Sequence, residues 1–137
     1  MNILLWVLQI FLALHTLMGA VWKFSHSPEQ SMASLKAIPP GLWSAMAILE
    51  LLCCLALIVP AFRRSLGRLA ALAAAFIIAE MLIFIGVHLQ SGSAEQGPLA
   101  YWAVVAALCG VIVYVRLRPT SAVEKRLVDK ATQPGPA

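Results

Sequence analysis

The sequence predicts an all-α membrane protein, a four-transmembrane-helix bundle with a short amphipathic helix in the first extramembrane loop. Of its 137 residues, 61% are hydrophobic and only 12% are charged, whereas soluble domains carry about a quarter charged residues. The mean hydropathy is +0.87, and the apolar residues gather in four long runs. A soluble fold of this length could not bury so much apolar surface, so we expect the bilayer to surround it.

The four runs cover about residues 2–21, 42–60, 69–89 and 99–115. Each holds roughly 17 to 21 residues, enough to cross a hydrocarbon core of about 30 Å at 1.5 Å per residue. Proline and glycine residues separate the later runs, because neither continues a helix well. Residues 1–119 are therefore expected to form one bundle, and the basic tail 120–137 to be largely disordered and cytoplasmic.

The first run could instead be a cleaved signal peptide. It lacks a Lys or Arg ahead of a long apolar stretch, and it contains Gln9 and His15. These features favour a membrane span. The small residues Gly19 and Ala20, which lie near a potential cleavage site, keep the alternative open.

The distribution of basic residues predicts the orientation of the bundle. Eight Lys and Arg lie in the second loop and the C-terminal tail, namely Arg63, Arg64, Arg68, Arg116, Arg118, Lys125, Arg126 and Lys130. Only Lys23 and Lys36 lie in the first and third loops. By the positive-inside rule, we expect both termini in the cytoplasm and the chain in the cell (plasma) membrane. Because the net charge of +4 comes from span ends, it does not indicate a nucleic-acid partner.

The first loop carries a helix-start signal. Ser27 stands at the N-cap position, Pro28 follows at the first helical position, and Gln30 comes three residues after the cap. Three apolar residues then recur at three-residue spacing, namely Met32, Leu35 and Ile38. This pattern predicts a short amphipathic helix lying on the outer membrane surface.

The third run has a small residue at every fourth position, namely Gly67, Ala71, Ala75 and Ala79. Small side chains let a neighbouring helix approach closely within a membrane. We therefore expect this stripe, together with Gly19 in the first run, to serve helix packing.

Three ionisable residues lie well inside the apolar runs: His15, Glu50 and Glu80. A charged side chain in a span costs at least about 2.5 kcal/mol, so such residues are functional by default. In the predicted orientation all three lie roughly 9 to 14 Å below the outer boundary. We expect them, with His88, to bound a polar pocket that opens outward and is capped by the loop-one helix.

The candidate ligand-binding or proton-relay residues are thus His15, Glu50, Glu80, His88 and Lys23. Lys23 also follows Trp22 at the end of the first run, where the two are expected to anchor the helix at the interface. The structural alternative is that the buried carboxyl groups donate hydrogen bonds to a neighbouring helix and fix its register. Nothing in the spacing of the histidines and glutamates is diagnostic of a metal site, and none is expected.

The three cysteines, Cys53, Cys54 and Cys109, all fall within apolar runs. Cys53 and Cys54 are adjacent on a helix, too close at Cα and too divergent for an ordinary disulfide. No C-x-x-C motif is present, so buried free cysteines are the favoured interpretation. Whether Cys109 approaches one of the other two stays open.

Four short motifs resemble those of the DoxX-like membrane proteins. Residues 17–24 (LMGAVWKF) are similar to the close of their first span, and residues 48–52 (ILELL) to their second span with its single glutamate. Residues 57–60 (LIVP) and 87–89 (VHL) also fit. The resemblance extends from residue 1 to about residue 118 and implies a four-helix membrane bundle.

The resemblance also implies functional or backbone-critical roles for four matching positions, namely Gly19, Lys23, Glu50 and His88. His15 and Glu80 lie outside the family pattern and suggest a subgroup or a distinct ligand. Some members of the family are linked to quinone-coupled sulfur oxidation, others to membrane thiol-redox complexes or quinone stress. Without a thiol pair in this sequence, a catalytic role does not carry over directly.

The first functional hypothesis is therefore a redox- or quinone-linked membrane subunit, with a quinone as its candidate ligand. Two alternatives remain: a non-catalytic assembly partner of other membrane or redox subunits, and a small proton-coupled transporter. The lipid bilayer is the one partner that composition requires, and self-association into a homo-oligomer is a further option. Whether the protein is an enzyme cannot be decided from these residues.

Overall fold

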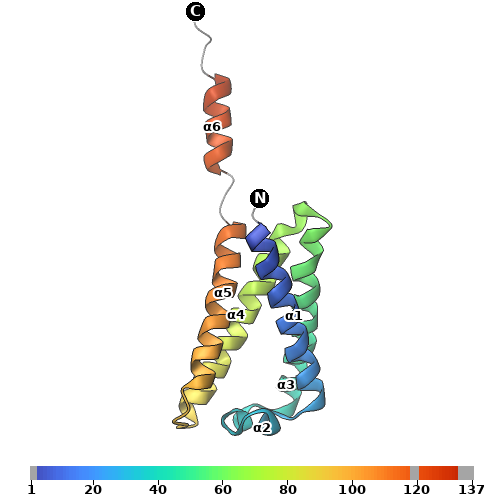
Figure 1. Ribbon diagram of the computed structural model, residues 1–137, viewed down its shortest axis with the longest axis vertical. Helices are drawn as coiled ribbons and strands as arrows, with labels where there is room; N and C mark the ends of the chain where they lie inside the picture. The colour runs from blue at the N-terminus through green and yellow to red at the C-terminus, as the bar shows by residue number, and fades with distance from the viewer. Residues whose placement is uncertain (1–2, 118–120, 133–137) are drawn as a thin grey trace, which may run out of the picture.

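The computed structural model describes residues 3–117 and 121–132, and Figure 1 shows their arrangement. Four helices are long and apolar enough to cross a membrane: α1 (Ile3–Ser25), α3 (Pro40–Ile58), α4 (Gly67–Gln90) and α5 (Gly97–Leu117). They coincide with the four predicted apolar runs and extend most of them by a few residues. In the described part of the chain, all regular structure is helical. The predicted fold class is confirmed.

The four helices run up and down in chain order (Figure 1). The start of α1, the connection between α3 and α4, and the end of α5 lie together at one end, which we call the N-terminal end. The first loop and the connection between α4 and α5 lie at the other, the loop-one end. Helix α1 packs chiefly on α3, and α4 packs on α5 and α3, whereas α1 and α5 contact each other little.

The packing face of α4 differs from the predicted small-residue stripe. Ala71 is buried and Gly67 is half-buried, but Ala75 and Ala79 are exposed. The buried face is instead made of residues at mixed spacings of three and four, namely Ala70, Ala73, Ala74, Ile77, Met81 and Phe84. A strict four-residue step advances about 40° beyond a full turn, so the predicted stripe rotates away from the neighbouring helices.

The first loop forms two short helices, α2 (Pro28–Ser31) and η1 (Ala33–Ala37). The predicted capping box is present: the Gln30 amide donates to Ser27 Oγ, and the Ser27 amide donates to Gln30 Oε1. Met32 adopts an extended backbone with φ −163° and separates the two helices. Leu35 is buried in the protein core instead of facing lipid, because η1 packs against α4.

The C-terminal tail also differs from the prediction, since residues Ser121–Thr132 form helix α6 where disorder was expected. Prolines flank this segment at positions 119 and 134, but neither proline nor glycine interrupts it, so a continuous helical ladder can form. The described side chains of Arg126 and Lys130 are exposed. Of the predicted tail, residue 120 and residues 133–137 lie outside the described residues, as do residues 118–119 at the end of the predicted bundle.

The three cysteines are buried and carry free thiols, as the absence of a suitable pair predicted. Cys109 is completely buried in the same core cluster as Cys53 and Cys54. The two short helices η2 (Val59–Ala61) and η3 (Arg64–Leu66) complete the connection between α3 and α4.

Candidate functional site

Three charged side chains from three helices meet inside the bundle. The Lys23 ammonium of α1 lies 2.6 Å from Glu50 Oε1 of α3 and 2.8 Å from Glu80 Oε1 of α4. The three side chains are only 6%, 7% and 10% exposed. We call this group the ion cluster. It brings together two of the three intramembrane residues singled out in the sequence, but through a lysine instead of through His15.

Lys23 was expected to anchor the end of α1 at the interface, and that expectation was wrong. Side chains in an α-helix lean toward its N-terminus, so a lysine in the last turn can extend back into the bundle. Its ammonium then lies 5.3 Å from the ring centre of Trp43 and 5.1 Å from that of Phe84. Two carboxylates and two ring faces thus replace the water that the charge has lost.

Gly19 makes room for the ion cluster. A Cβ atom added at this position would lie 3.2 Å from Glu50 Oε1 and 3.6 Å from Glu50 Oε2. The distance to Oε1 is shorter than that of most Cβ contacts in proteins. Gly19 is one helical turn before Lys23, on the same face of α1. The glycine therefore lets the carboxylate of α3 approach the backbone of α1.

The charges of the ion cluster do not balance if both carboxyl groups are ionised, because one ammonium faces two carboxylates. Glu50 Oε2 is buried and has no hydrogen-bond partner among the described residues. A single added proton would make the cluster neutral, which a low-dielectric interior favours. Glu50 Oε2 is thus an oxygen of the ion cluster that remains available for a further hydrogen bond.

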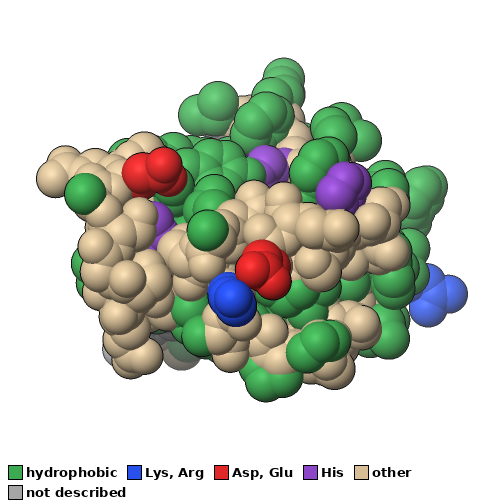
Figure 2. Space-filling model, turned by 90° about the horizontal axis from the view of Figure 1, so that it is seen from below, with side chains coloured by type: hydrophobic (Ala, Val, Ile, Leu, Met, Phe, Trp, Pro, Cys, Tyr) green, Lys and Arg blue, Asp and Glu red, His purple; other side chains and the backbone are tan. Residues whose placement is uncertain are grey.

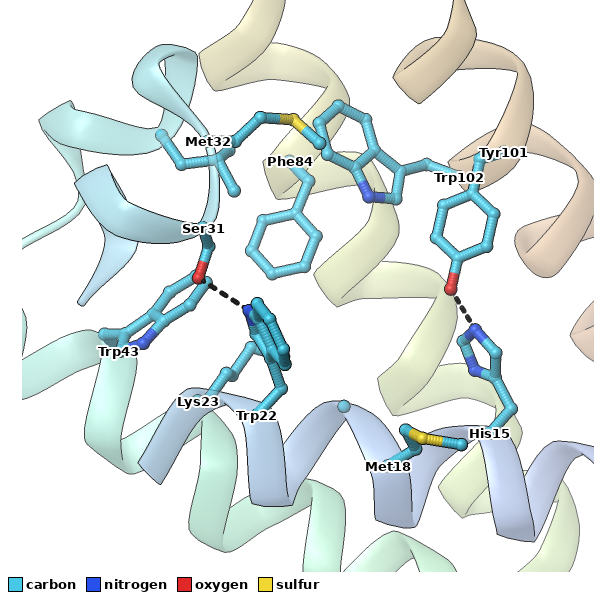
Figure 3. Close-up of a pocket in the computed structure, with 12 residues that line it drawn as sticks. His15, Met18, Trp22, Lys23, Ser31, Met32, Trp43, Phe84, Tyr101 and Trp102 are labelled. Atoms are coloured by element: carbon cyan, nitrogen blue, oxygen red, sulfur yellow. Dashed lines mark hydrogen bonds between the residues drawn. The ribbon is translucent and has the colours of Figure 1, made fainter. Parts of the chain in front are cut away.

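A cavity of about 330 Å³ adjoins the ion cluster (Figure 3). All four long helices and the first loop contribute to its lining, which consists of His15, Met18, Gly19, Trp22, Lys23, Ser31, Met32, Leu35, Trp43, Phe84, Tyr101 and Trp102. Most of this surface is aromatic or aliphatic, in contrast to the predicted polar pocket. Glu50 and Glu80 are not part of the lining and lie behind Lys23.

His15 forms a hydrogen bond between its Nε2 and the Tyr101 hydroxyl, which joins α1 to α5 at one side of the cavity (Figure 3). The direction of this bond depends on the imidazole tautomer. His15 thus lines the same cavity as Lys23, eight residues away on α1, without joining the ion cluster.

The first loop covers the cavity, as predicted for the loop-one cap. The Trp22 indole donates a 3.1 Å hydrogen bond to Ser31 Oγ, and its ring stacks on His26 at 3.8 Å. Met32 and Leu35 of the same loop complete the cover.

His88 is fully buried but does not line the cavity. Its Nε2 donates to the Glu95 carbonyl oxygen at 2.8 Å, because a carbonyl can only accept, and its Nδ1 lies 2.8 Å from Ser34 Oγ. Its ring meets the edge of Trp102 at 5.4 Å between centres. His88 therefore connects the end of α4 to the first loop and to the α4–α5 connection.

The aromatic lining was missed in the sequence. Trp43, Tyr101 and Trp102 lie near predicted span ends, where interfacial aromatic belts account for such residues. In the structure Trp43 and Trp102 are buried and flank Phe84, at ring-centre distances of 6.1 Å and 5.6 Å. No spacing rule separates a belt residue from a cavity residue, so contacts between helices were needed to find them.

The cavity opens sideways between α1 and α5. Met18, Trp22 and Tyr101 line it and are also 73%, 51% and 50% exposed. Since the first loop covers the end of the cavity and α1 contacts α5 little, its open side lies between these two helices. This differs from the predicted outward opening.

A second polar group lies near the N-terminal end of the bundle. Arg116 donates to Gln9 Oε1, and Gln9 Nε2 donates to the Leu57 carbonyl at 3.2 Å. The Arg116 guanidinium also lies 5.6 Å from the Trp6 ring centre. These contacts satisfy a buried amide and tie three helices together, which is a structural role. Within residues 3–117 and 121–132, no cluster of three His, Cys, Asp or Glu side chains could hold a metal ion.

The comparison with protein families matches residues 7–114 to the DoxX-like family. The comparisons with curated proteins and with solved structures gave no match. The matched residues include the whole ion cluster and every side chain that lines the cavity.

Proposed function

This chain belongs to the DoxX-like family of membrane proteins, and on that premise we propose that it is a redox- or quinone-linked membrane subunit. Its ligand is a neutral, flat, lipophilic ring with carbonyl acceptors, bound in the cavity between α1 and α5. The observation that carries this proposal is an aromatic cavity with hydrogen-bonding groups at Lys23 and at the His15–Tyr101 pair.

The size and lining of the cavity suit such a ring. Small-molecule sites commonly occupy about 300 to 1,000 Å³ and combine apolar walls with a few polar groups. The cavity measures about 330 Å³. The rings of Trp22, Trp43, Phe84 and Trp102 offer faces and edges against which a planar ligand can stack.

The polar groups of the cavity suit carbonyl acceptors. The Lys23 ammonium has three N–H groups, of which two donate to Glu50 and Glu80, so the third can donate to a ligand oxygen. The Tyr101 hydroxyl and His15 supply a second hydrogen-bonding point. A neutral acceptor fits best, because the carboxylates behind Lys23 would repel an anion.

The ion cluster supports a link to proton transfer. Reduction of a quinone to the quinol takes up two electrons and two protons. A partner redox subunit would supply the electrons, and the carboxyl groups behind Lys23 could supply one of the protons. Glu50 and Glu80 would hold this proton at their carboxylate oxygens, and Lys23 would stabilise the ionised form.

We propose that the loop-one end of the bundle faces the outside of the cell and that both termini lie in the cytoplasm. Arg63 and Arg68 follow α3 and begin α4 at the N-terminal end, and Arg116 ends α5 there. At the loop-one end Lys23 is buried, so it adds no positive charge to the surface there. The excess of exposed basic side chains at the N-terminal end is therefore larger than the sequence alone indicates. Figure 2 views the loop-one end and shows few Lys, Arg, Asp or Glu side chains among apolar side chains, histidines, and the backbone and other side chains.

Quinone binding by the purified protein tests the proposed function. A 1,4-benzoquinone without a side chain should quench the fluorescence of the cavity tryptophans at saturable, micromolar to millimolar concentrations. His15→Ala should weaken its affinity about tenfold, the effect of one lost hydrogen bond of about 1.4 kcal/mol. Ser44→Ala, an exposed change on α3, should leave affinity unchanged. Unchanged affinity in both His15→Ala and Glu50→Gln would exclude this site.

A second candidate function, that of a non-catalytic assembly partner, is favoured by the exposed alanines of α4. Ala75 and Ala79 leave a shallow surface on which another transmembrane helix can pack closely. Stable co-purification with another membrane subunit, lost in Ala75→Leu and Ala79→Leu and independent of quinone, would support this alternative.

A further inference from the structure

We propose that the natural ligand is an amphiphile dissolved in the bilayer, with its ring in the cavity at Lys23 and an apolar chain lying along the seam between α1 and α5. The chain ends in a second cavity near the N-terminal end of the bundle. This inference rests on the proposed function and specifies the chemical class of the ligand.

Among the described residues, those that line the second cavity are all aliphatic and belong to the same two helices. The cavity has a volume of about 370 Å³ and is lined by Ile3, Leu4, Leu5, Leu8, Val111 and Val115. None of these six side chains is polar, so none could form a hydrogen bond to a headgroup. Its chemistry fits a hydrocarbon chain.

The His15–Tyr101 hydrogen bond joins α1 to α5 where the seam begins, so the chain passes this pair on its exposed side. Beyond this pair, the seam between the two cavities is apolar. Phe11 and Leu14 on α1 and Val104 on α5 lie between them along the helices and are exposed. Every residue of α5 from position 103 to 110 is apolar or glycine. A chain that follows the seam therefore meets no charged side chain, and its path stays within the membrane-spanning part of both helices.

The geometry of the first cavity directs the chain into this seam. Loop one covers the end of the cavity, and its open side lies between Met18 and Trp22 of α1 and Tyr101 of α5. From His15 to Leu8 is seven residues, or about 10 Å along α1, and from His15 to Leu4 is about 17 Å. A chain of this reach connects the two cavities without leaving the bilayer.

The seam is distinguishable from ordinary lipid-facing surface. A groove of about 200 Å³ between α3 and α4, lined by residues such as Leu52, Leu72 and Phe76, is equally apolar but does not adjoin the ion cluster. Bulk lipid should occupy both surfaces, whereas a chain tethered to a ring at Lys23 can reach only the α1–α5 seam. This groove is therefore an internal control.

Photocrosslinking of the full-length protein in vesicles tests the proposal. The probe is a benzoquinone bearing an alkyl chain with a diazirine at its end, and the comparison probe is a fatty acid with the same diazirine. We expect the quinone probe to label peptides containing Ile3–Leu8 and Val111–Val115, and excess chainless benzoquinone to reduce that labelling at least fivefold. Labelling by the fatty acid should be insensitive to benzoquinone and should include the α3–α4 groove.

Two variants separate the ring site from the chain site. Leu8→Trp fills the second cavity, so it should displace the crosslinks while chainless benzoquinone still binds with unchanged affinity. Leu52→Trp, on the α3–α4 groove, is the matched control and should alter neither. Equal labelling of seam and groove, or labelling that benzoquinone does not compete, would overturn the chain site alone. Failure of chainless benzoquinone to bind would overturn the proposed function and this inference together.

Discussion

At the scale of single residues, the charges of the ion cluster of Lys23, Glu50 and Glu80 need partners because they lie inside a membrane bundle. The sequence did not predict this contact, since the partner of both glutamates is a lysine that was expected at the interface. A buried ion pair gains little over a well-packed apolar pair, but removing one member leaves an uncompensated charge in a low-dielectric interior. Here the single ammonium offsets two carboxyl groups, at 2.6 and 2.8 Å. The stability of the bundle should therefore depend strongly on Lys23.

Lys23→Met keeps the length of the side chain and removes the charge. We expect it to lower the free energy of unfolding in detergent by about 3 to 5 kcal/mol, the cost of breaking a buried ion pair. Denaturant unfolding followed by circular dichroism measures this. Lys36→Met, at a salt bridge with Glu29 whose side chains are 72% and 63% exposed, should cost less than about 1 kcal/mol.

Removing the charges of the two glutamates should offset the loss of stability caused by Lys23→Met. Lys23→Met combined with Glu50→Gln and Glu80→Gln should recover part of the lost stability, because no unpaired charge remains. If Lys23→Met and Lys36→Met had the same effect, or the triple variant were less stable than Lys23→Met alone, the ion cluster would not have the role assigned to it.

Gly19→Ala tests the close approach of Glu50 to α1. The added Cβ would lie 3.2 Å from Glu50 Oε1, so the carboxylate would have to shift and weaken its contact with Lys23. We expect a lower melting temperature in detergent. Gly86→Ala on α4 is the matched control, because a Cβ there would meet no atom within 4 Å and alanine favours the helix by about 1 kcal/mol. A Gly19→Ala protein as stable as Gly86→Ala would contradict this explanation.

Among the elements, the first loop stands out because it is fixed to three helices. The Trp43 indole of α3 donates to the His26 carbonyl at 2.8 Å, Trp22 of α1 donates to Ser31, and His88 of α4 contacts Ser34. These hydrogen bonds hold the first loop in place over the cavity. Its local stability should influence access to the cavity.

Ser27→Ala removes the cap of α2 and should destabilise that helix by about 1 kcal/mol. The Ser31 and Met32 amides, which donate to the Ser27 and Pro28 carbonyls, should then exchange with deuterium about fivefold faster. Hydrogen exchange with mass spectrometry measures this effect. Ser44→Ala, which removes an exposed hydroxyl on α3, should not change exchange in the loop. Unchanged protection of the loop in Ser27→Ala would show that tertiary contacts alone hold it.

For the molecule as a whole, the proposed topology has four spans, which put both termini on the same side of the membrane, and the positive-inside rule predicts that this side is the cytoplasm. Glu29→Cys, in the first loop, should react with an impermeant maleimide added to intact cells. Phe62→Cys, exposed between α3 and α4, should react only after permeabilisation. The three native cysteines are buried, so they should give little background. The reverse labelling pattern would invert the bundle and place the cavity near the cytoplasmic face.

The four spans and the capping box of α2 could be predicted because both depend on residues close together in the chain. A run of about 20 apolar residues is enough to specify a span, and Ser27 and Gln30 are only three positions apart. Glu50 and Glu80 could also be singled out, since the cost of burying a carboxylate does not depend on which helix lies next to it.

The partners of those residues depended on how the helices pack. Lys23 is 27 and 57 positions from the two glutamates, and His15 is 86 positions from Tyr101. Whether Ala75 is buried, or Trp102 lines a cavity instead of an interface, is set by the rotation of each helix about its axis. That rotation follows from side-chain packing between helices, because in a membrane the apolar character of a surface does not distinguish a lipid neighbour from a protein neighbour.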